Sequence, residues 1–429
     1  MKDIATYALE ALAKAGAEKA AVKVSSGRTD EFNVEAAKFT LLRTLFNDEL
    51  SLKAIKGGRK GTISVNKLDK DSVDKAVEEC VTLANSAATD EAEDIAPLEE
   101  NKNFSRLIGS ADMAKLFARS KEFLEQSEDE FPKVTLEMTA EFNSNKEVYL
   151  NSNGVEFSDE VEHYDVGTTF AATDGDVNSS FNYYSMQTDS LAVPFMDLGM
   201  QRTLLEDTAK SLVTRSVDDK FVGKIIVAPS CYDMIWLTII ECFLSNYVMI
   251  NGTSRWKDAL GSVVADPKLT MRAAPLAAGI VAAERFTGDG FVSRDADYIK
   301  EGVLASFALD LYGANKTGRP RSANTAVYNI DVAAGDTPYA DMIKSVDKGI
   351  LVNRFSGAMP GPSGDISGVA KNSFLIENGQ VTDAVSETML AFNIVDILRN
   401  IPAISRERCA NGMMLLPWCC FDGVTVSGK

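Results

Sequence analysis

The sequence predicts an α+β fold of two domains: an N-terminal antiparallel sheet flanked by helices, then a C-terminal sheet-rich domain. A chain of 429 residues is longer than one hydrophobic core usually needs. The first half runs helix, several strands, helix, which is typical of an α+β unit, whereas the second half is mainly short strands and glycine-rich turns. We therefore place the domains at residues 1–215 and 216–429.

The first domain opens with an amphipathic helix, because apolar residues recur with a 3.6-residue period between Asp3, the predicted N-cap, and Gly16. A glycine pair, Gly57-Gly58, marks a turn among strands. The strand-like segments are residues 20–25, 31–35, 39–45, 50–56 and 62–65. The next helix is expected at about residues 72–87, where apolar residues again share one face.

Residues 90–103 are acidic and poor in large apolar side chains, so they are predicted to form a linker whose acids are solvated. A helix at residues 113–124 follows, and then alternating strands. The turn residues Asn151-Ser152-Asn153-Gly154 predict a hairpin between two of these strands. Further strands are expected at residues 168–172 and 180–185, and a helix at about residues 197–213.

The second domain begins with a strand at residues 224–229 and an apolar helix at about residues 232–249. Short strands follow to the end of the chain. Among them lies a loop rich in glycine and proline at residues 353–367, which contains Ser356, Gly357, Gly361, Gly364 and Asp365. This loop either lines a cavity or contacts a partner, or its glycines simply satisfy turn geometry.

Composition excludes several classes of function. The net charge is −18, with 62 acidic and 44 basic residues, so the surface repels phosphate backbones and we expect no direct contact with nucleic acid. No run of about 18 apolar residues indicates a membrane span. The N-terminus lacks the pattern of a signal peptide, so we expect a cytoplasmic protein.

Metal ligands are scarce. The chain has one histidine, His163, in an alternating, strand-like stretch, and six scattered cysteines without a CxxC pair. A histidine pair for zinc is therefore ruled out, and the cysteines are expected to be reduced, buried side chains. We expect no bound cofactor or metal and no catalytic residue of this chain's own.

An ordered set of segments resembles the TldD/PmbA family, in the PmbA/TldE-like branch that lacks HExxxH. The similar stretches include Ser363–Ala370 (SGDISGVA), Phe374–Gly379 (FLIENG), Ala391–Asn393 with Asp396–Ile401, and Leu415–Pro417. They occur in the family's order, and the opening helix is also similar to that of PmbA-type members.

The resemblance implies a two-domain, cytoplasmic protein that assembles in pairs. In TldD-type subunits, HExxxH follows the central strand and a later cysteine completes a zinc site. Counting along this chain places Leu237 and Thr238 at the His-Glu pair, Cys242 at the second histidine and Cys409 near the cysteine. Leucine cannot bind zinc and threonine is a poor general base, so the motif is degenerate.

The leading hypothesis is a non-catalytic TldE/PmbA-like subunit, a pseudoenzyme of a TldD-type zinc metallopeptidase system for peptide proteolysis or maturation. It would form a homodimer, or a heterodimer with a TldD-type zinc subunit, and help to hold unfolded peptides, for instance by strand addition. One alternative is an interaction protein that modulates DNA gyrase. Another is a metal-dependent hydrolase with an unrecognised site.

Overall fold

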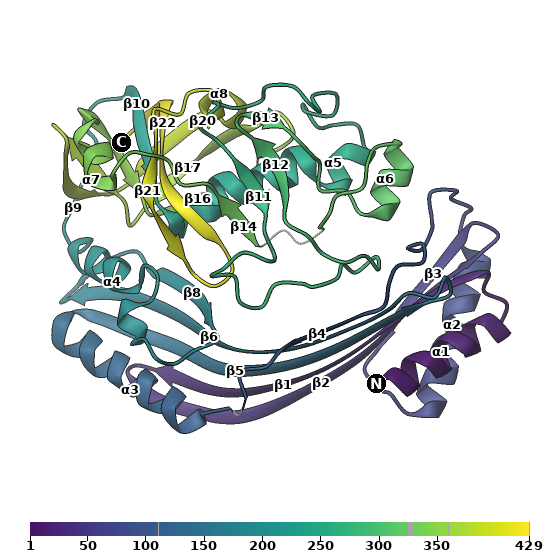
Figure 1. Cartoon of the computed structure of the whole chain (residues 1–429). Coiled ribbons are helices and arrows are strands. Elements are labelled where there is room, and N and C mark those ends of the chain that lie inside the picture. Colours follow the sequence, from purple (N-terminus) through teal and green to yellow (C-terminus); the bar gives the residue numbers. More distant parts are fainter. Residues whose placement is uncertain (110, 325–328, 359, 429) are drawn as a thin grey trace.

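The computed structural model describes residues 1–429 except 110, 325–328, 359 and 429. Its N-terminal half is built on an eight-stranded sheet of very long strands that curve into a cradle (Figure 1). The principal strands follow the order β3-β2-β1-β5-β6-β4, and β8 also pairs with β6. The strands are β1 Lys19–Glu35, β2 Lys38–Lys56, β3 Arg59–Val65, β4 Lys102–Arg106, β5 Val134–Asn151, β6 Glu156–Asp174, β7 Val177–Asn178 and β8 Asn182–Thr188.

This sheet is antiparallel except that β4 runs parallel to β6. The predicted short segments merge, because β1 and β2 pair from Lys19↔Ile55 to Glu35↔Lys38 with one irregularity. The predicted hairpin at Asn151–Gly154 is confirmed, since it joins β5 to β6.

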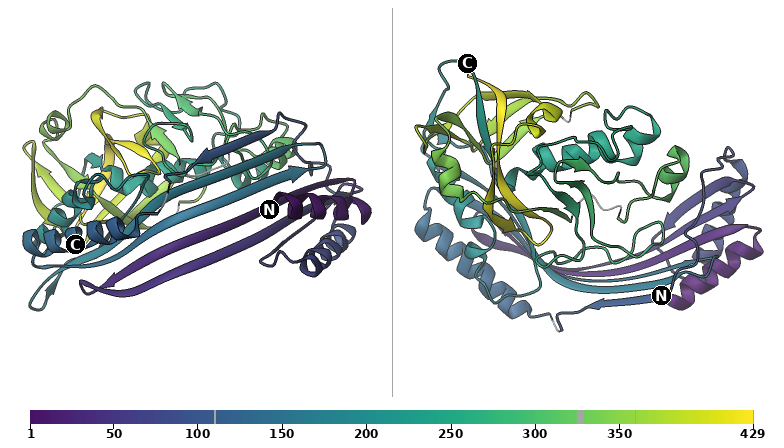
Figure 2. Two further views of the ribbon diagram at one scale, coloured as in Figure 1. Left: turned by 60° about the horizontal axis from the view of Figure 1, so that its bottom comes forward. Right: turned by 45° about the horizontal axis from the view of Figure 1, so that its top comes forward.

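Three helices, α1 Lys2–Lys14, α2 Lys70–Ser86 and α3 Met113–Glu130, cover the face of the first sheet that is turned away from the second domain (Figures 1 and 2). A fourth helix, α4 Gln201–Lys210, lies beside the second domain and bonds it through Asp207. The predicted N-cap of the first helix was wrong: Asp3 lies inside the first turn and Met1 takes the cap position. In the first turn, the negative charge of the Asp3 carboxylate interacts favourably with the positive end of the helix dipole, but its side chain does not cap the helix.

The second half forms a fourteen-stranded mixed sheet in which β10 lies between β22, antiparallel, and β15, parallel. Its strands are β9 Thr214–Arg215, β10 Phe221–Val227, β11 Met271–Ala273, β12 Ala296–Lys300, β13 Val303–Leu304, β14 Ile330–Val332, β15 Lys348–Val352, β16 Arg354–Gly357, β17 Asp365–Lys371, β18 Phe374–Glu377, β19 Gln380–Val385, β20 Thr388–Asn393, β21 Ala403–Ala410 and β22 Leu415–Ser427. Its α-helices are α5 Asn246–Ile250, α6 Leu311–Thr317, α7 Tyr339–Lys344 and α8 Ile394–Leu398. The predicted α+β class, with a sheet-rich C-terminal half, is confirmed.

We keep the predicted division at residue 215/216 as a proposal. The short strand β9 ends at Arg215 and already pairs with β19 of the second sheet. The two halves meet through apolar and polar contacts: Phe286 packs on Tyr149 and Phe157, and buried Asn353 donates to Asp207 at 2.8 Å.

One prediction for residues 90–103 was wrong. Glu93 is buried, with its side chain only 4% exposed, and it forms ion pairs with Lys53, at 3.1 Å, and with Lys60. Ile95 and Ala96 are also buried. The segment is therefore packed against the first sheet. Its buried acid is stabilised there by two lysines, one on β2 and one on β3.

In the part of the chain that the structure describes, no helix has the length and apolar character required to cross a membrane.

Candidate functional site

The degenerate motif positions Leu237, Thr238 and Cys242 lie in the helical segment that follows β10. The predicted helix at residues 232–249 is present but mostly not α-helical. Two π-helical stretches, Asp233–Leu237 and Ile240–Leu244, precede α5. The backbone turns to an extended conformation at Ser245, whose N–H donates to the carbonyl of Ile240 at 2.8 Å.

The π-helical winding has a direct consequence for spacing. A π-helix closes i→i+5 hydrogen bonds, so residues five apart lie one above the other, and such stretches occur frequently at functional sites. Leu237 and Cys242 are five apart, as the two histidines of HExxxH are. The backbone winding is thus compatible with two ligands on one face, but the side chains present are a leucine and a thiol.

Asp233 and Thr238 form a second pair five residues apart, and they face a small cavity. The Thr238 hydroxyl donates to the Asp233 carbonyl at 3.1 Å. The cavity has a volume of about 60 Å³, and Asp233 and Thr238 line it together with Met234, Phe355, Gly357, Ala358, Pro360 and Ile366. Burial raises the pKa of the Asp233 carboxyl, so this cavity holds one partly desolvated acid among mainly apolar groups.

The four motif positions do not come together as a zinc site. Leu237 has no donor atom, and the Thr238 hydroxyl is already bonded to backbone. Burial raises the pKa of the Cys242 thiol to about 11, and its Sγ contacts the Pro360 carbonyl at 3.1 Å. A zinc-binding cysteine must be a thiolate, so this environment is the opposite of what the metal needs.

Cys409 lies elsewhere. It is on β21, packs against a different hydrophobic cluster from that of Cys242, and its Sγ is 3.5 Å from the hydroxyl of Tyr184 on β8. Burial raises its pKa as well. Across the described residues, no three histidine, cysteine, aspartate or glutamate side chains are grouped so that they could hold a metal. The residues present therefore do not fit the zinc that the resemblance associates with the family.

The glycine- and proline-rich loop predicted at residues 353–367 is shorter in the structure, because Ser356 and Gly357 belong to β16 and Asp365 begins β17. The connection between these strands is held by hydrogen bonds of its own. The Gly364 N–H donates to the Gly361 carbonyl at 3.0 Å, and Gly364 has φ +81°, which favours glycine. Asp365 accepts from Asn393 Nδ2 at 2.8 Å, and this bond lowers its pKa. Of the predicted loop residues, Gly357 lines the 60 Å³ cavity, whereas Ser356, Gly361, Gly364 and Asp365 lie outside its lining.

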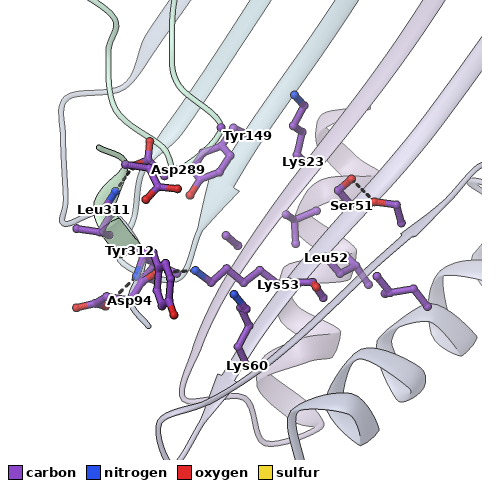
Figure 3. Close-up of a pocket in the computed structure, with 18 residues that line it drawn as sticks. Lys23, Ser51, Leu52, Lys53, Lys60, Asp94, Tyr149, Asp289, Leu311 and Tyr312 are labelled. Atoms are coloured by element: carbon purple, nitrogen blue, oxygen red, sulfur yellow. Dashed lines mark hydrogen bonds between the residues drawn. The ribbon is translucent and has the colours of Figure 1, made fainter. Parts of the chain in front are cut away.

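A much larger hollow lies between the two halves of the chain, and the sequence did not indicate it. Its volume is about 390 Å³; it is walled by the ends of β1, β2, β3 and β5 on one side and by residues 288–289 and 310–312 on the other. Figure 3 shows Lys53 and Lys60 directed towards Asp94 and Tyr312 on the opposite wall of this hollow, which we call the interdomain cleft.

The charges of the interdomain cleft are neutralised in place. Lys53 and Lys60 both form ion pairs with the buried Glu93. Lys23 pairs with Glu147, and Asp289 pairs with Arg321 at 2.6 Å. Burial raises the pKa of Tyr149 to about 12. The cleft is thus a polar surface with little net charge, suited to a backbone rich in hydrogen-bonding groups rather than to a strongly charged ligand.

A row of acids crosses the first sheet on its inner face. Glu31, Glu141 and Asp165 lie directly opposite one another on β1, β5 and β6, and burial raises the pKa of Glu141. The single histidine, His163, is buried two residues from Asp165 on the same strand, and its Nε2 lies 2.9 Å from the Asp165 carboxylate. Such a row costs stability, and the sequence gives no sign of it because it depends on the register of three strands.

In the comparison with protein families, the match lies in the second half of the chain. Residues 222–428 match the model of the PmbA/TldA metallopeptidase C-terminal domain. The chain is 29% identical to the metalloprotease PmbA of Escherichia coli O157:H7 over 167 residues, which is 37% of either chain. A metalloprotease PmbA homolog of Haemophilus influenzae is 24% identical over the whole of this chain and 96% of its own length.

Solved structures share the complete fold. A Bacteroides thetaiotaomicron protein named as a candidate modulator of DNA gyrase aligns with a TM-score of 0.89 at 22% identity, covering 100% of this chain and 99% of its own. TldE from Thermococcus kodakarensis aligns with a TM-score of 0.83 at 16% identity and covers both chains fully. At these identities the likeness establishes the fold alone.

Proposed function

Because its C-terminal half is a domain of the PmbA/TldD family, as the sequence resemblance indicated, we propose that this chain is a non-catalytic, TldE/PmbA-like subunit of a zinc metallopeptidase system. The observation that carries the proposal is the content of the helix after β10. The HExxxH positions hold Leu237, Thr238 and Cys242, and the thiol is kept protonated by burial. The metal and the water-activating glutamate would then come from a TldD-type partner.

The chain's own contribution would be to bind peptide. The interdomain cleft supports this role because it is polar and of low net charge, and β3 borders it through Lys60, Thr62 and Ser64. Along its length β3 pairs with β2, and it ends the strand order of its sheet. On its other side it forms one isolated bridge, between Arg59 and Thr89. An extended peptide laid along β3 would gain main-chain hydrogen bonds without any catalytic side chain of this subunit.

The test is reconstitution of peptidase activity. The purified chain is assayed on an unfolded, fluorescently labelled peptide alone, with a TldD-type zinc subunit from the same source, and with that subunit in which the HExxxH glutamate is replaced. We expect cleavage only when the intact zinc subunit is present, and more of it when this chain is added. Cleavage by this chain alone would overturn the proposal.

A second candidate function follows from the name of the Bacteroides thetaiotaomicron neighbour, a modulator of DNA gyrase. The net charge of −18 would favour contact with a basic protein surface over contact with DNA. Supercoiling assays with and without this chain separate the two functions, because a peptidase subunit should leave the supercoiling rate unchanged.

A further inference from the structure

One end of the β3 edge is closed by the chain itself. Arg59, the first residue of β3, forms an isolated antiparallel bridge with Thr89, and the Asp90 N–H donates to the Gly58 carbonyl at 2.7 Å. The segment that contains Thr89 and Asp90 thus crosses the edge beside the start of β3. A peptide strand added along the rest of β3 would run into this segment, so the closed end of the edge is a place for a chain terminus.

Past the bridge, the backbone of β3 is turned toward an added strand at two positions. A two-residue turn of glycines with positive φ joins β2 to β3 and pairs Lys56 with Arg59. Residues that flank such a turn hydrogen-bond each other, so the N–H and C=O groups of Thr62 and Ser64 point away from β2. Both residues are exposed and line the interdomain cleft. A peptide bonded to them would have its terminus next to Lys60.

Lysines outnumber carboxylates at the closed end. Lys53 and Lys60 both pair with the buried Glu93, and Lys19 pairs with Asp94 at 2.6 Å. Three ammonium groups therefore share two carboxylates, which leaves one positive charge over. The side chains of Lys53 and Lys60 are 27% and 39% exposed, and Figure 3 shows both in the lining of the cleft. A ligand with a single negative charge would complete this group.

The opposite wall of the cleft meets these lysines with an aromatic ring. The ring centre of Tyr312 lies 5.1 Å from Lys60 Nζ. The acids of that wall are engaged elsewhere, because Asp289 pairs with Arg321 at 2.6 Å and Asp310 caps α6 through its side chain. An aromatic face beside an ammonium group limits its hydration, so an ion pair formed here is stronger than one on the open surface.

We propose that the closed end of the interdomain cleft binds the free C-terminal carboxylate of an extended peptide, which pairs antiparallel with β3 and reaches Lys60 and Lys53 with its last residue. The proposal rests on the peptide-binding role given above and adds the class of ligand, a linear peptide with an unmodified C-terminus. Charge sets the direction of the peptide. An antiparallel strand arrives at Arg59 with its carboxylate, whereas a parallel strand would bring its α-ammonium group against the lysines. Carboxylate–ammonium bonds are charge-assisted, and like charges in contact repel.

Binding is measured by fluorescence anisotropy with two forms of one peptide. The peptide is unstructured, has uncharged side chains and carries fluorescein at its N-terminus; one form ends in a free carboxylate and the other in an amide. We expect the purified chain to bind the free-acid form about 10-fold more tightly, which is the effect of one charge-assisted hydrogen bond. Equal affinity for both forms would overturn the proposal and leave peptide binding intact. Binding of neither form would refute the peptide-binding role itself, and this proposal with it.

Variants assign the effect to the lysines. Lys60→Met leaves Lys53 alone with Glu93, so it should bind both forms as weakly as the wild type binds the amide, and its unchanged affinity for the amide shows that the cleft is folded. Lys60→Arg keeps the charge and should keep the preference. The matched control is Lys121→Met, which removes an ammonium group paired with a glutamate on α3 and should behave as wild type. A preference for the free acid that survives in Lys60→Met would overturn the assignment to the closed end.

The direction of the peptide is tested by photo-cross-linking. A benzophenone side chain beside the C-terminus of the free-acid peptide should react with residues 89–95. The same group near the N-terminus of the peptide should react with the other end of β3, at Ser64 and Val65. Mass spectrometry of proteolytic fragments locates the adducts, and the opposite pattern would contradict antiparallel pairing with β3.

Discussion

Replacing Asp207 by asparagine should stabilise the protein at neutral pH. Asp207 is on α4, nine-tenths buried between the two halves of the chain, and its Oδ2 accepts from Asn353 Nδ2 at 2.8 Å. The nearest cation, Lys210, is 4.0 Å away. Burial raises the pKa of Asp207 from 3.8 to about 6, because one amide hydrogen bond and a distant ammonium replace little of the lost hydration.

The magnitude follows from linkage. A folded pKa of about 6 against 3.8 in the unfolded chain means that holding the charge in the folded state costs roughly 3 kcal/mol at about 1.36 kcal/mol per unit. The folded pKa is the higher one, so stability from this group is fully present below pH 3.8 and is lost as pH rises through 6. Asparagine is neutral at every pH and keeps an oxygen that can accept from Asn353. We therefore expect Asp207→Asn to gain up to about 3 kcal/mol at pH 8 and nothing near pH 4.

The assay is urea unfolding of wild type and Asp207→Asn between pH 4 and pH 8. The difference between the two proteins at each pH isolates Asp207 from the other acids that titrate. Asp341→Asn, at an exposed position on α7, is the control and should give a difference that varies little with pH. A difference for Asp207→Asn that stays constant across this range would refute the assigned burial of its charge.

Three further predictions concern packing, backbone and thiol chemistry. Phe243→Ala should cost about 3–5 kcal/mol in urea unfolding, because the ring is fully buried and stacks on Trp256 at 4.5 Å; a loss below about 1 kcal/mol would contradict this packing. Gly412→Ala should cost at least about 1 kcal/mol, since φ is +82° and the added Cβ would lie 2.1 Å from the Gln187 carbonyl; an unchanged melting temperature would contradict it. Cys242 should resist Ellman's reagent at pH 8 until the protein is unfolded, because its pKa is about 11; peptide mapping that finds rapid labelling in the folded state would refute this.

The fold class could be predicted because local patterns carry it. The apolar period of α2, with Val73, Ala76, Val77, Cys80 and Val81 buried, is visible in the sequence, and so is the hairpin turn at residues 151–154. The length of the strands could not be predicted. Residues such as Ser25–Asp30 interrupt the apolar alternation of β1, yet they stay in the strand because they pair with β2 on one side and β5 on the other.

For the candidate site, the sequence could predict which residues stand at the motif positions but not how they are arranged in space. The sequence shows which residues stand at the motif positions, and hence that histidine is missing. It does not show the π-helical winding, because the residue types of an apolar helix do not distinguish i→i+4 from i→i+5 bonding. The interdomain cleft and the row of Glu31, Glu141 and Asp165 depend on register and on the docking of two sheets, which no single segment encodes. The burial of Glu93 depends on Lys53 and Lys60 in the same way.

The central claim is that this chain has no zinc centre of its own and takes part in a peptidase only through a partner. The most direct measurement is the metal content of the purified chain by mass spectrometry, after growth with zinc and extensive dialysis, alone and after mixing with a TldD-type subunit. We expect substoichiometric zinc in the isolated chain and zinc that follows the amount of the partner in the mixture. One zinc per chain in the isolated protein would show that this chain binds the metal itself, with Asp233 and Cys242 as the first ligands to replace.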